Sequence, residues 1–467
     1  MLMPVRLIAA LAGLGSLLVP LSAKAQVVTT LAGSGAYGSA DGTGTAATFY
    51  TPQGVAVDSS GNVYVADRVN NKIRKITPTG EVTTFAGSGA LGSDDGPGAA
   101  ATFFRPNGVA VDLSRNVYVA DSGNNKIRAI TPASVVSTLA GSGAIGSEDG
   151  PGAEATFGWA VGVAADSSGN VYVADSGSNK IRKIAAGGVV TTLAGSGAGG
   201  SADGSGDVAT FSEPSGVAVD SSGNVFVADT DSHKIRKIAP GGVVTTFAGS
   251  GAPGSADGTG TAATFTLPFG VAVDSSMNVF VADSGNNKIR KITPAGVVST
   301  LAGSGAYGSA DGIGTAATFY APSGVAVDSS GHVYVADSGS NKIRKITQPP
   351  GPCVQDAFTA CLINGRYKVT SHWQNQYAGG QVSQLSAAPL TDATAAFWLS
   401  DADTYEYLIR VNTATDNGRA WIAIPTFTDV EFWIAVTDTM GSNQDFEYHS
   451  PAGNRTLIYD PYFFVYP

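Results

Sequence analysis

The sequence predicts an all-β protein in which a six-bladed β-propeller, closed by its own N-terminal strand, is followed by a small β-sandwich domain. Three observations carry this prediction. One unit recurs six times at a fixed spacing, each unit reads as four short strands, and one extra strand precedes the first unit. A fixed period of this length is the signature of an architecture built by repeating one supersecondary unit.

The period is marked by the motif Val-Ala-Asp, whose aspartate recurs every 54 residues without an insertion or deletion. The six copies of that aspartate are Asp67, Asp121, Asp175, Asp229, Asp283 and Asp337.

The first repeat predicts four strands, over residues 54–58, 62–67, 72–76 and 82–86. The segments between them are turn signals such as Ser-Ser-Gly and Thr-Pro-Thr-Gly, and no helical period interrupts the unit. Four short strands joined by tight turns form an antiparallel meander. One such sheet cannot bury both of its faces, whereas six sheets arranged radially can. The innermost strand carries small residues, as crowding around a central axis requires.

The order of the strands predicts how the ring closes. The fourth-strand motif begins at Val28, Val82, Val136, Val190, Val244 and Val298, and its first copy precedes every first strand. The last repeat, which ends at Ile346, has no fourth strand of its own. We therefore expect the N-terminal strand to complete the sixth blade, which removes the open edge of the sheet.

The repeat, with Gly-Val-Ala-Val-Asp-Ser-Ser-Gly-Asn-Val-Tyr-Val-Ala-Asp followed by Asn-Asn-Lys-Ile-Arg-Lys-Ile, resembles the NHL repeat family. The resemblance covers about 320 of the 467 residues and recurs six times. It implies a six-bladed propeller but no single function, since such folds host binding modules, sensors and a few enzymes.

The N-terminus, residues 1–25, reads as a secretory signal peptide. Arg6 supplies the positive charge, residues 7–19 the apolar stretch, and Ala23-Lys24-Ala25 a cleavage site. A retained anchor is the alternative. No later stretch approaches the roughly 20 apolar residues that a membrane span needs. We expect a soluble monomer that is secreted, periplasmic or at the cell surface, with no transmembrane segment after signal removal.

Charge and cysteine content narrow the function classes further. The formal net charge is −10, so the basic excess that drives nucleic-acid binding is absent. The two cysteines of the chain, Cys353 and Cys361, are expected to form one disulfide in an exported protein.

The propeller is predicted to span residues 26–347, and a Pro/Gly-rich linker follows at 348–352. From 353 to 467 the period is lost, and strands are expected at 366–372, 395–399, 405–411, 420–424, 430–437 and 445–448. The motif Cys-x-Gln-Asp-Ala followed by Cys-Leu-x-Asn-Gly-Arg-Tyr-x-Val resembles a β-rich accessory module of exported bacterial proteins. Its tryptophans are expected in a core rather than in a carbohydrate platform, which stays the alternative.

Several recurring residues are assigned structural roles. The aspartates that precede glycine in the long connections, such as Asp41, are expected to shape the loop as Asx-turns rather than to bind calcium. The strand-ending aspartates and the Lys-Ile-Arg motif are expected to form ion pairs between blades or to cap loops. Phe49 and its five counterparts are expected to fill the joints between blades.

An enzymatic function needs residues that are unique to one repeat. His233 and His332 are expected on opposite faces, so they cannot share a metal. Glu213 and Asn107 could contribute to one divalent ion in the central channel, but a second central carboxylate is not evident. We therefore expect no cofactor and no metal site. A metal-dependent hydrolase or lyase with an ion in the channel remains the alternative.

Variation among the repeats concentrates at the entry to the innermost strand, which lies at the mouth of the central channel in a propeller. The candidate ligand-binding residues there are Gln53, Arg105, Asn107, Trp159, Glu213 and Phe269. Polar and aromatic groups that converge in a concavity are the default hypothesis for a binding site. The sequence thus predicts a non-enzymatic binding protein whose propeller face takes an extracellular or envelope protein, peptide or glycan. Neutral drift at exposed positions is the alternative explanation.

Overall fold

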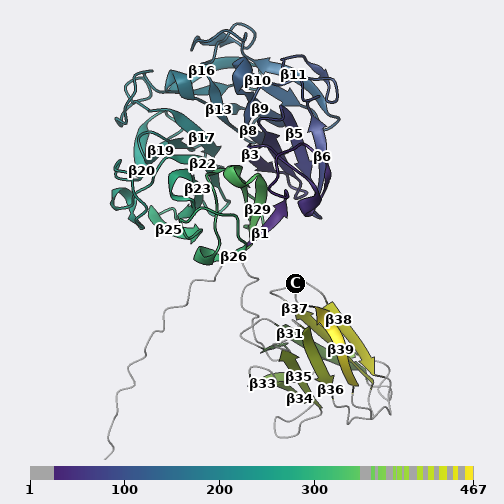
Figure 1. Cartoon of the computed structure of the whole chain (residues 1–467). Coiled ribbons are helices and arrows are strands. Elements are labelled where there is room, and N and C mark those ends of the chain that lie inside the picture. The colour runs from purple at the N-terminus through teal and green to yellow at the C-terminus, as the bar shows by residue number, and fades with distance from the viewer. Residues whose placement is uncertain are drawn as a thin grey trace, which may run out of the picture.

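The computed structural model describes residues 26–347 and, beyond them, ten strands between residues 359 and 465 (Figure 1). The predicted signal peptide (1–25) and linker (348–352) lie outside the described residues. No helix in the described part is long and apolar enough to cross a membrane.

Residues 26–347 form six antiparallel sheets, which are the blades of the predicted propeller. Blade 1 consists of β2 (Gly42–Thr43), β3 (Pro52–Val57), β4 (Val63–Asp67), β5 (Lys72–Ile76) and β6 (Glu81–Ala86). Blade 2 consists of β7 (Gly96–Pro97), β8 (Pro106–Val111), β9 (Val117–Asp121), β10 (Lys126–Ile130) and β11 (Val135–Ala140). Blade 3 consists of β12 (Gly150–Pro151), β13 (Ala160–Ala165), β14 (Val171–Asp175), β15 (Lys180–Ile184) and β16 (Val189–Ala194).

The second half repeats this arrangement. Blade 4 has four strands, β17 (Pro214–Val219), β18 (Val225–Asp229), β19 (Lys234–Ile238) and β20 (Val244–Ala248). Blade 5 consists of β21 (Gly258–Thr259), β22 (Pro268–Val273), β23 (Val279–Asp283), β24 (Lys288–Ile292) and β25 (Val297–Ala302). Blade 6 consists of β26 (Gly312–Ile313), β27 (Pro322–Val327), β28 (Val333–Asp337), β29 (Lys342–Thr347) and the N-terminal strand β1 (Val27–Ala32).

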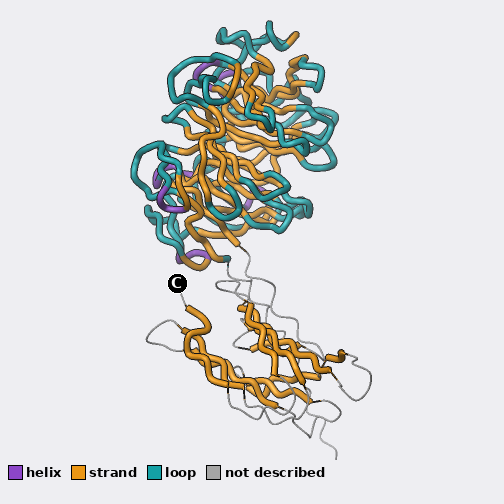
Figure 2. Tube along the Cα trace, turned by 90° about the vertical axis from the view of Figure 1, so that its right-hand side faces the viewer, coloured by secondary structure: helices purple, strands orange, loops and turns teal. Residues whose placement is uncertain are grey.

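Helical structure in the described part is confined to single 3-10 turns in the loops (Figure 2). They are η1 (Gly44–Ala46), η2 (Ser122–Asn124), η3 (Ser176–Ser178), η4 (Gly260–Ala262), η5 (Ser284–Asn286), η6 (Gly314–Ala316) and η7 (Ser338–Ser340).

The N-terminal strand closes the ring as predicted. β1 pairs antiparallel with β29 of blade 6, where Val28 lies opposite Ile346, and its other edge pairs with β26. The side chain of Val28 is fully buried in the joint between blades 5 and 6. The first and last strands of the propeller therefore share one sheet, and blade 6 has an outermost strand like the other blades.

The structure adds one strand that the sequence analysis read as loop. In five blades, two residues of the long connection pair with the outermost strand, as Gly42 does with Val82. Blade 4 makes a single bridge at that place, between Gly204 and Val244. A two-residue strand is too short to leave an alternating pattern, so the sequence carries no signal for it.

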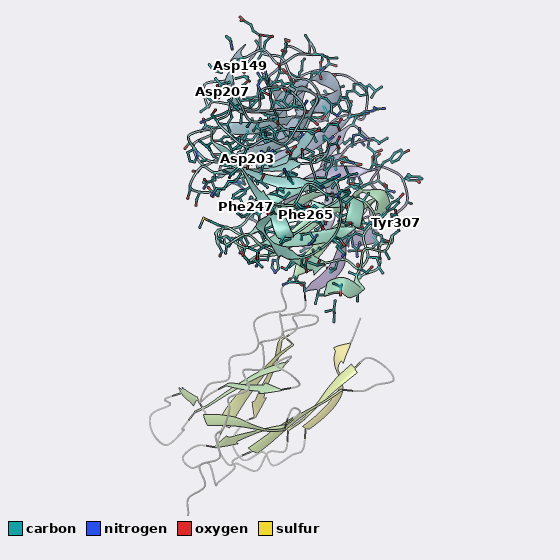
Figure 3. All side chains as sticks on the ribbon, turned by 90° about the vertical axis from the view of Figure 1, so that its left-hand side faces the viewer. Asp149, Asp203, Asp207, Phe247, Phe265 and Tyr307 are labelled. Carbon is teal, nitrogen blue, oxygen red and sulfur yellow. The ribbon has the colours of Figure 1, made fainter. Side chains whose placement is uncertain are left out.

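The core of the propeller lies between neighbouring blades. Phe49, which is fully buried, packs with Val65 of blade 1 and with Tyr334 and Ile343 of blade 6. The equivalent phenylalanines in the other blades are also fully buried; Figure 3 labels one of them, Phe265. The predicted role of these rings in filling the joints is confirmed.

Six glycines set how closely the innermost strands approach. A Cβ built on Gly54 would lie 2.5 Å from the carbonyl oxygen of Asn107 in the next blade. The five equivalent glycines meet the next blade's backbone in the same way around the ring, and Gly324 meets Gln53 to complete it. Glycine is required here because any side chain would push the blades apart.

Beyond the propeller, ten strands form two antiparallel sheets. One contains β30 (Thr359–Leu362), β31 (Tyr367–Gln374), β32 (Val382–Gln384), β37 (Glu431–Asp438) and β38 (Asp445–Ser450). The other contains β33 (Ser386–Thr391), β34 (Thr394–Trp398), β35 (Tyr407–Thr413), β36 (Arg419–Ile424) and β39 (Ile458–Val465).

All six strands predicted in this region are present to within a few residues, and four more join them. The predicted sandwich packing depends on side chains outside the described part of the chain. The predicted disulfide includes Cys353, which also lies outside it. Both stay predictions.

Candidate ligand site at the channel mouth

The mouth of the central channel is built from the residue that precedes each innermost strand. These six residues all have a positive φ, between 47° and 61°: Thr51, Arg105, Trp159, Glu213, Leu267 and Ala321. The left-handed conformation costs a residue other than glycine about 1–2 kcal/mol. The chain therefore carries side chains at six positions where glycine would relieve the backbone.

A side chain of the preceding blade fixes each of these residues. The N–H of Arg105 donates to Asn71 Oδ1 at 2.9 Å, and the N–H of Glu213 donates to Asn179 Oδ1 at 3.0 Å. For Leu267, which leads into blade 5, blade 4 supplies a histidine in place of the asparagine, and His233 Nδ1 accepts from the N–H of Leu267 at 3.1 Å. His233 thus has a structural partner at the mouth. His332 instead bonds Asp328 within the turn between β27 and β28.

A buried ionic network holds the connection that leads to the mouth. In blade 1 the Arg74 guanidinium donates to Asp67 at 2.8 Å and to Asp41 at 2.6 Å, and it lies 5.2 Å from the centre of the Phe49 ring. Asp67 Oδ1 also accepts from the N–H of Tyr50, one residue before the mouth. The same network recurs in all six blades; Figure 3 labels Asp149 and Asp203, the counterparts of Asp41.

The network corrects two details of the sequence analysis. Asp41 does have a structural role, but it pairs with an arginine from a distant strand instead of forming an Asx-turn. The Asx-turn belongs to Asp58, whose Oδ1 accepts from the N–H groups of Ser60 and Asn62. Two carboxylates flank the buried Arg74. The strand-ending Asp67 is an ion-pair partner and a loop cap, but its arginine lies in the same blade and not, as predicted, in the neighbouring one.

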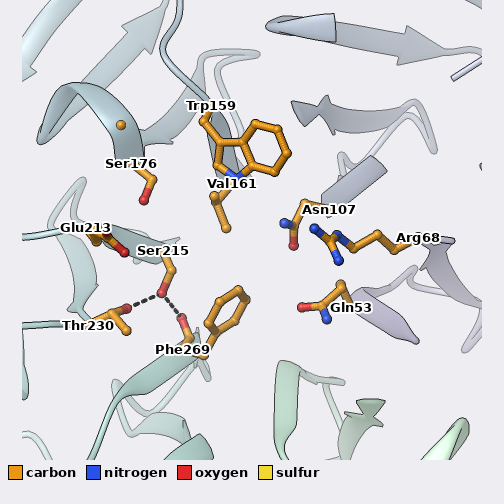
Figure 4. Close-up of a pocket in the computed structure, with 11 residues that line it drawn as sticks. Gln53, Arg68, Asn107, Trp159, Val161, Ser176, Glu213, Ser215, Thr230 and Phe269 are labelled. Atoms are coloured by element: carbon orange, nitrogen blue, oxygen red, sulfur yellow. Dashed lines mark hydrogen bonds between the residues drawn. The ribbon is translucent and has the colours of Figure 1, made fainter. Parts of the chain in front are cut away.

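A cavity of about 520 Å³ opens at the mouth (Figure 4). This volume lies within the range of about 300–1,000 Å³ that is typical of small-molecule sites. Five of the six candidate residues line it together: Gln53, Asn107, Trp159, Glu213 and Phe269. Below it the glycine ring narrows the channel to a space of about 50 Å³. The cavity is therefore a recess (the cup) above a constriction of the channel.

The sixth candidate, Arg105, is not among the residues that line this cavity. Its guanidinium lies 5.5 Å from the centre of the neighbouring Phe104 ring, and the side chain is exposed. An arginine that stacks on an adjacent aromatic ring gains a cation–π contact without entering the cup.

Three polar residues that line the cup were not among the predicted site residues, and they share one repeat position. Arg68, Ser176 and Thr230 each follow a strand-ending aspartate. The other copies of this position are Ser122, Ser284 and Ser338. Arg68 is the one residue of the six without a hydroxyl, and that departure from the repeat was the available signal.

The hydroxyl at this position has a structural task in other blades. Thr230 Oγ1 donates to the carbonyl of Pro268 in the next blade at 2.8 Å, and Ser338 donates in the same way to Pro52. Arg68 gives up that inter-blade hydrogen bond and places a guanidinium at the cup instead.

Near Arg68, two polar atoms of the cup lack hydrogen-bond partners within the described residues. Arg68 Nε and Asn107 Oδ1 are buried and make no hydrogen bond there, and Asn107 is only 5% exposed. Burial lowers the pKa of Arg68, and the positive charge of Arg105 lowers it further. No ion pair of Arg68 occurs in the described part. This edge of the cup therefore carries unneutralised positive charge.

Metal-ligand chemistry has no evident centre in the described residues, where no three His, Cys, Asp or Glu side chains cluster in a way that could hold an ion. At the mouth, Glu213 is the one carboxylate that lines the cup.

Five of the six repeats match the model of the NHL repeat, at residues 49–76, 103–130, 157–184, 211–238 and 319–346. The remaining copy, at 265–292, keeps the same buried network through Asp283 and Arg290. The predicted resemblance is confirmed: the chain contains NHL repeats arranged as a six-bladed propeller.

Curated relatives share the repeat region. The chain is 30% identical over 333 residues to NHL repeat-containing protein 2 of Gallus gallus, a match that covers 63% of this chain and 46% of that protein. It is 30% identical over 285 residues to the protein SUPPRESSOR OF QUENCHING 1, chloroplastic, of Arabidopsis thaliana, covering 57% and 27%. The chain spans less than half the length of these relatives.

Solved structures share the fold. A structural genomics protein of unknown function from Bacteroides thetaiotaomicron is similar with a TM-score of 0.55 at 22% identity, covering 69% of this chain and 76% of that one. An auxiliary nutrient binding protein from the same organism is similar with a TM-score of 0.53 at 18% identity and the same coverage. At these identities the likeness is one of fold.

Proposed function

We propose, from the premise that this chain is an NHL-repeat six-bladed propeller, that it is an exported, non-enzymatic binding protein. Its ligand is a protein, peptide or glycan of the envelope or the extracellular space, and it binds in the cup at the mouth of the central channel. The segment from 353 to 467 serves as a second interaction or attachment module.

One observation carries the proposal: the scaffold is uniform, whereas the cup is not. Every blade repeats the same buried aspartate, arginine and phenylalanine. At the mouth the same blades present Gln53, Asn107, Trp159, Glu213 and Phe269 around a single cavity. Six identical blades would give a six-fold symmetric rim, and a rim that differs at each blade suits a ligand with distinct groups.

The backbone supports the same conclusion. Trp159 and Glu213 hold their side chains over the cup from left-handed backbone positions that favour glycine. Strain that persists because the surroundings fix it tends to gather at binding sites. The binding role of the similarly folded auxiliary nutrient binding protein named above also agrees with the proposal.

The test is a triple variant, Gln53→Ala, Trp159→Ala and Glu213→Ala, screened with the unmodified chain on arrays of glycans and peptides. We expect the wild-type protein to retain a ligand that the variant loses by at least tenfold in affinity, at an unchanged melting temperature. A control triple variant, Leu113→Ala, Val135→Ala and Val189→Ala, removes exposed apolar side chains outside the cup and should bind normally. Equal binding by both triple variants contradicts the proposal.

A further inference from the structure

The cup has two chemically different sides. Arg68, Asn107 and Gln53 lie together on one side, and Glu213 lies on the other, with Trp159 and Phe269 between them (Figure 4). Ser215 and Thr230 also reach the cup, but their hydroxyls are engaged with each other and with the carbonyls of Phe269 and Pro268. The groups free to meet a ligand are therefore a guanidinium, two amides, a carboxylate, the Ser176 hydroxyl and two aromatic rings.

Each free group is complementary to a particular kind of ligand group. The unneutralised Arg68 guanidinium matches a carboxylate, whose planar oxygens it can bind in a fork. Asn107 Oδ1, buried without a partner, needs an O–H or N–H donor, and the exposed Glu213 carboxylate can accept one. Leaving such a buried acceptor unsatisfied costs about 1–3 kcal/mol. The exposed face of Trp159 and the ring of Phe269 offer flat apolar surfaces.

We propose that the ligand is a carbohydrate bearing a carboxylate, a sugar acid, with its carboxylate on Arg68 and its hydroxyls on Asn107 and Glu213. This inference rests on the proposed function and specifies its ligand class. A neutral sugar would leave Arg68 without a counter-charge. A purely apolar acid would leave the buried Asn107 Oδ1 without a donor. A cation would be repelled by Arg68.

Comparison of the repeats suggests a substitution that removes the charge of Arg68 without destabilising the fold. Arg68→Ser installs the residue that Ser122 and Ser338 represent in other blades, where its hydroxyl bonds the next blade's carbonyl. This variant should unfold at or above the wild-type temperature. Arg105→Ser is the control: it removes a positive charge that acts on Arg68 from an exposed side chain outside the cup, and so tests whether nearby charge without contact is enough.

The experiment is calorimetric titration of the full chain with an α-1,4-linked trigalacturonate and with its methyl ester, which has the same rings without the charge. We expect the acid to bind at least tenfold tighter than the ester. Arg68→Ser should abolish that ratio and keep the affinity for the ester, and Arg105→Ser should retain the ratio.

Equal binding of acid and ester to the wild type overturns the inference, as does loss of the ratio in Arg105→Ser alone. Tighter binding of a tripeptide with a free carboxyl terminus than of its amide, in the absence of sugar binding, overturns it in favour of a peptide. If an array ligand is lost from the alanine triple variant while neither galacturonate form binds, the inference fails and the proposed function stands.

Discussion

Each blade buries one arginine between two aspartates and beside a phenylalanine ring. The side chains of Arg236 and Asp229 are both fully buried and lie 2.8 Å apart, whereas Asp203 is half exposed. Removing one partner of a buried pair leaves an uncompensated charge and costs roughly 3–5 kcal/mol, although replacing both partners is often close to neutral. Replacing one residue of the pair should therefore lower the stability more than replacing both.

We predict that Arg236→Met lowers the free energy of unfolding by roughly 3–5 kcal/mol. Arg236→Met combined with Asp229→Asn should recover part of that loss, because no buried charge then stays unpaired. Urea unfolding followed by tryptophan fluorescence measures both. A double variant that is less stable than the single one would show that the pair does not act as described.

The two kinds of aspartate should respond to pH with opposite signs. Burial raises the pKa of Asp337 to about 6, although the N–H of Tyr320 and Arg344 favour its charged form. Its contribution to stability is therefore greatest below about pH 4 and falls as the pH rises toward 6. Partial burial acts to raise the pKa of Asp203, but hydrogen bonds from Thr246 and Arg236 lower it overall. Its contribution is present above about pH 4 and is lost as the pH falls.

Melting temperatures from pH 3 to 7 test this contrast. The stability advantage of the wild type over Asp337→Asn should shrink as the pH rises from 4 to 7. The advantage over Asp203→Asn should stay level across that range and shrink below pH 4. Parallel profiles for the two variants would contradict the assignment.

For single residues, the sequence could predict that a side chain has a structural role but not which residue it contacts. The repeated aspartates read as structural from their recurrence, yet Asp41 and Arg74 are 33 positions apart and meet only because the blade folds. The left-handed backbone conformation at the mouth could not be predicted, because none of the six residues there is glycine, the residue that usually indicates it. Arg115 and Met277 show the same effect, since both adopt a positive φ where four other repeats place glycine.

At the scale of the element, the innermost strand is defined by its glycine. Gly54 approaches the backbone of the next blade so closely that a Cβ would clash with a carbonyl oxygen. Because the neighbouring atom belongs to the backbone, the clash cannot be relieved by rotating a side chain.

Gly54→Ala should therefore lower the melting temperature by several degrees or prevent folding. Gly187→Ala is the matched control: a Cβ there has no neighbour within 4 Å, and that substitution should be neutral. Thermal denaturation monitored by circular dichroism compares them. Equal melting temperatures for the two variants would contradict the close approach of the innermost strands at Gly54.

The strands were the most predictable elements, because alternation and turn residues mark them directly. The four main strands of each blade follow the predicted ranges closely. The two-residue outer strands were not predicted, because they form only by pairing with the neighbouring strand and are too short to show an alternating sequence pattern. The cup was predicted through five of its residues, whereas Arg68 belongs to a loop whose approach to the mouth only the folded ring reveals.

For the whole molecule, the constant period fixes the number of blades, and the position of the first fourth-strand motif fixes how they close. Thr29 of β1 lies opposite Lys345 of β29 although 316 positions separate them. Without that pairing, blade 6 would end at β29, and the ring of blades that frames the cup would not be closed.

The most direct test of the account is a cross-link across this seam, with Thr29→Cys and Lys345→Cys in one chain and disulfide mapping by mass spectrometry. We predict that the two introduced thiols join within one molecule and raise the unfolding temperature, because a bond that closes so long a loop constrains the unfolded chain. The pairing of Thr29→Cys with Lys237→Cys, at the equivalent position of blade 4, should give no bond. Equal cross-linking to either partner, or to neither, would contradict a propeller closed by its first strand.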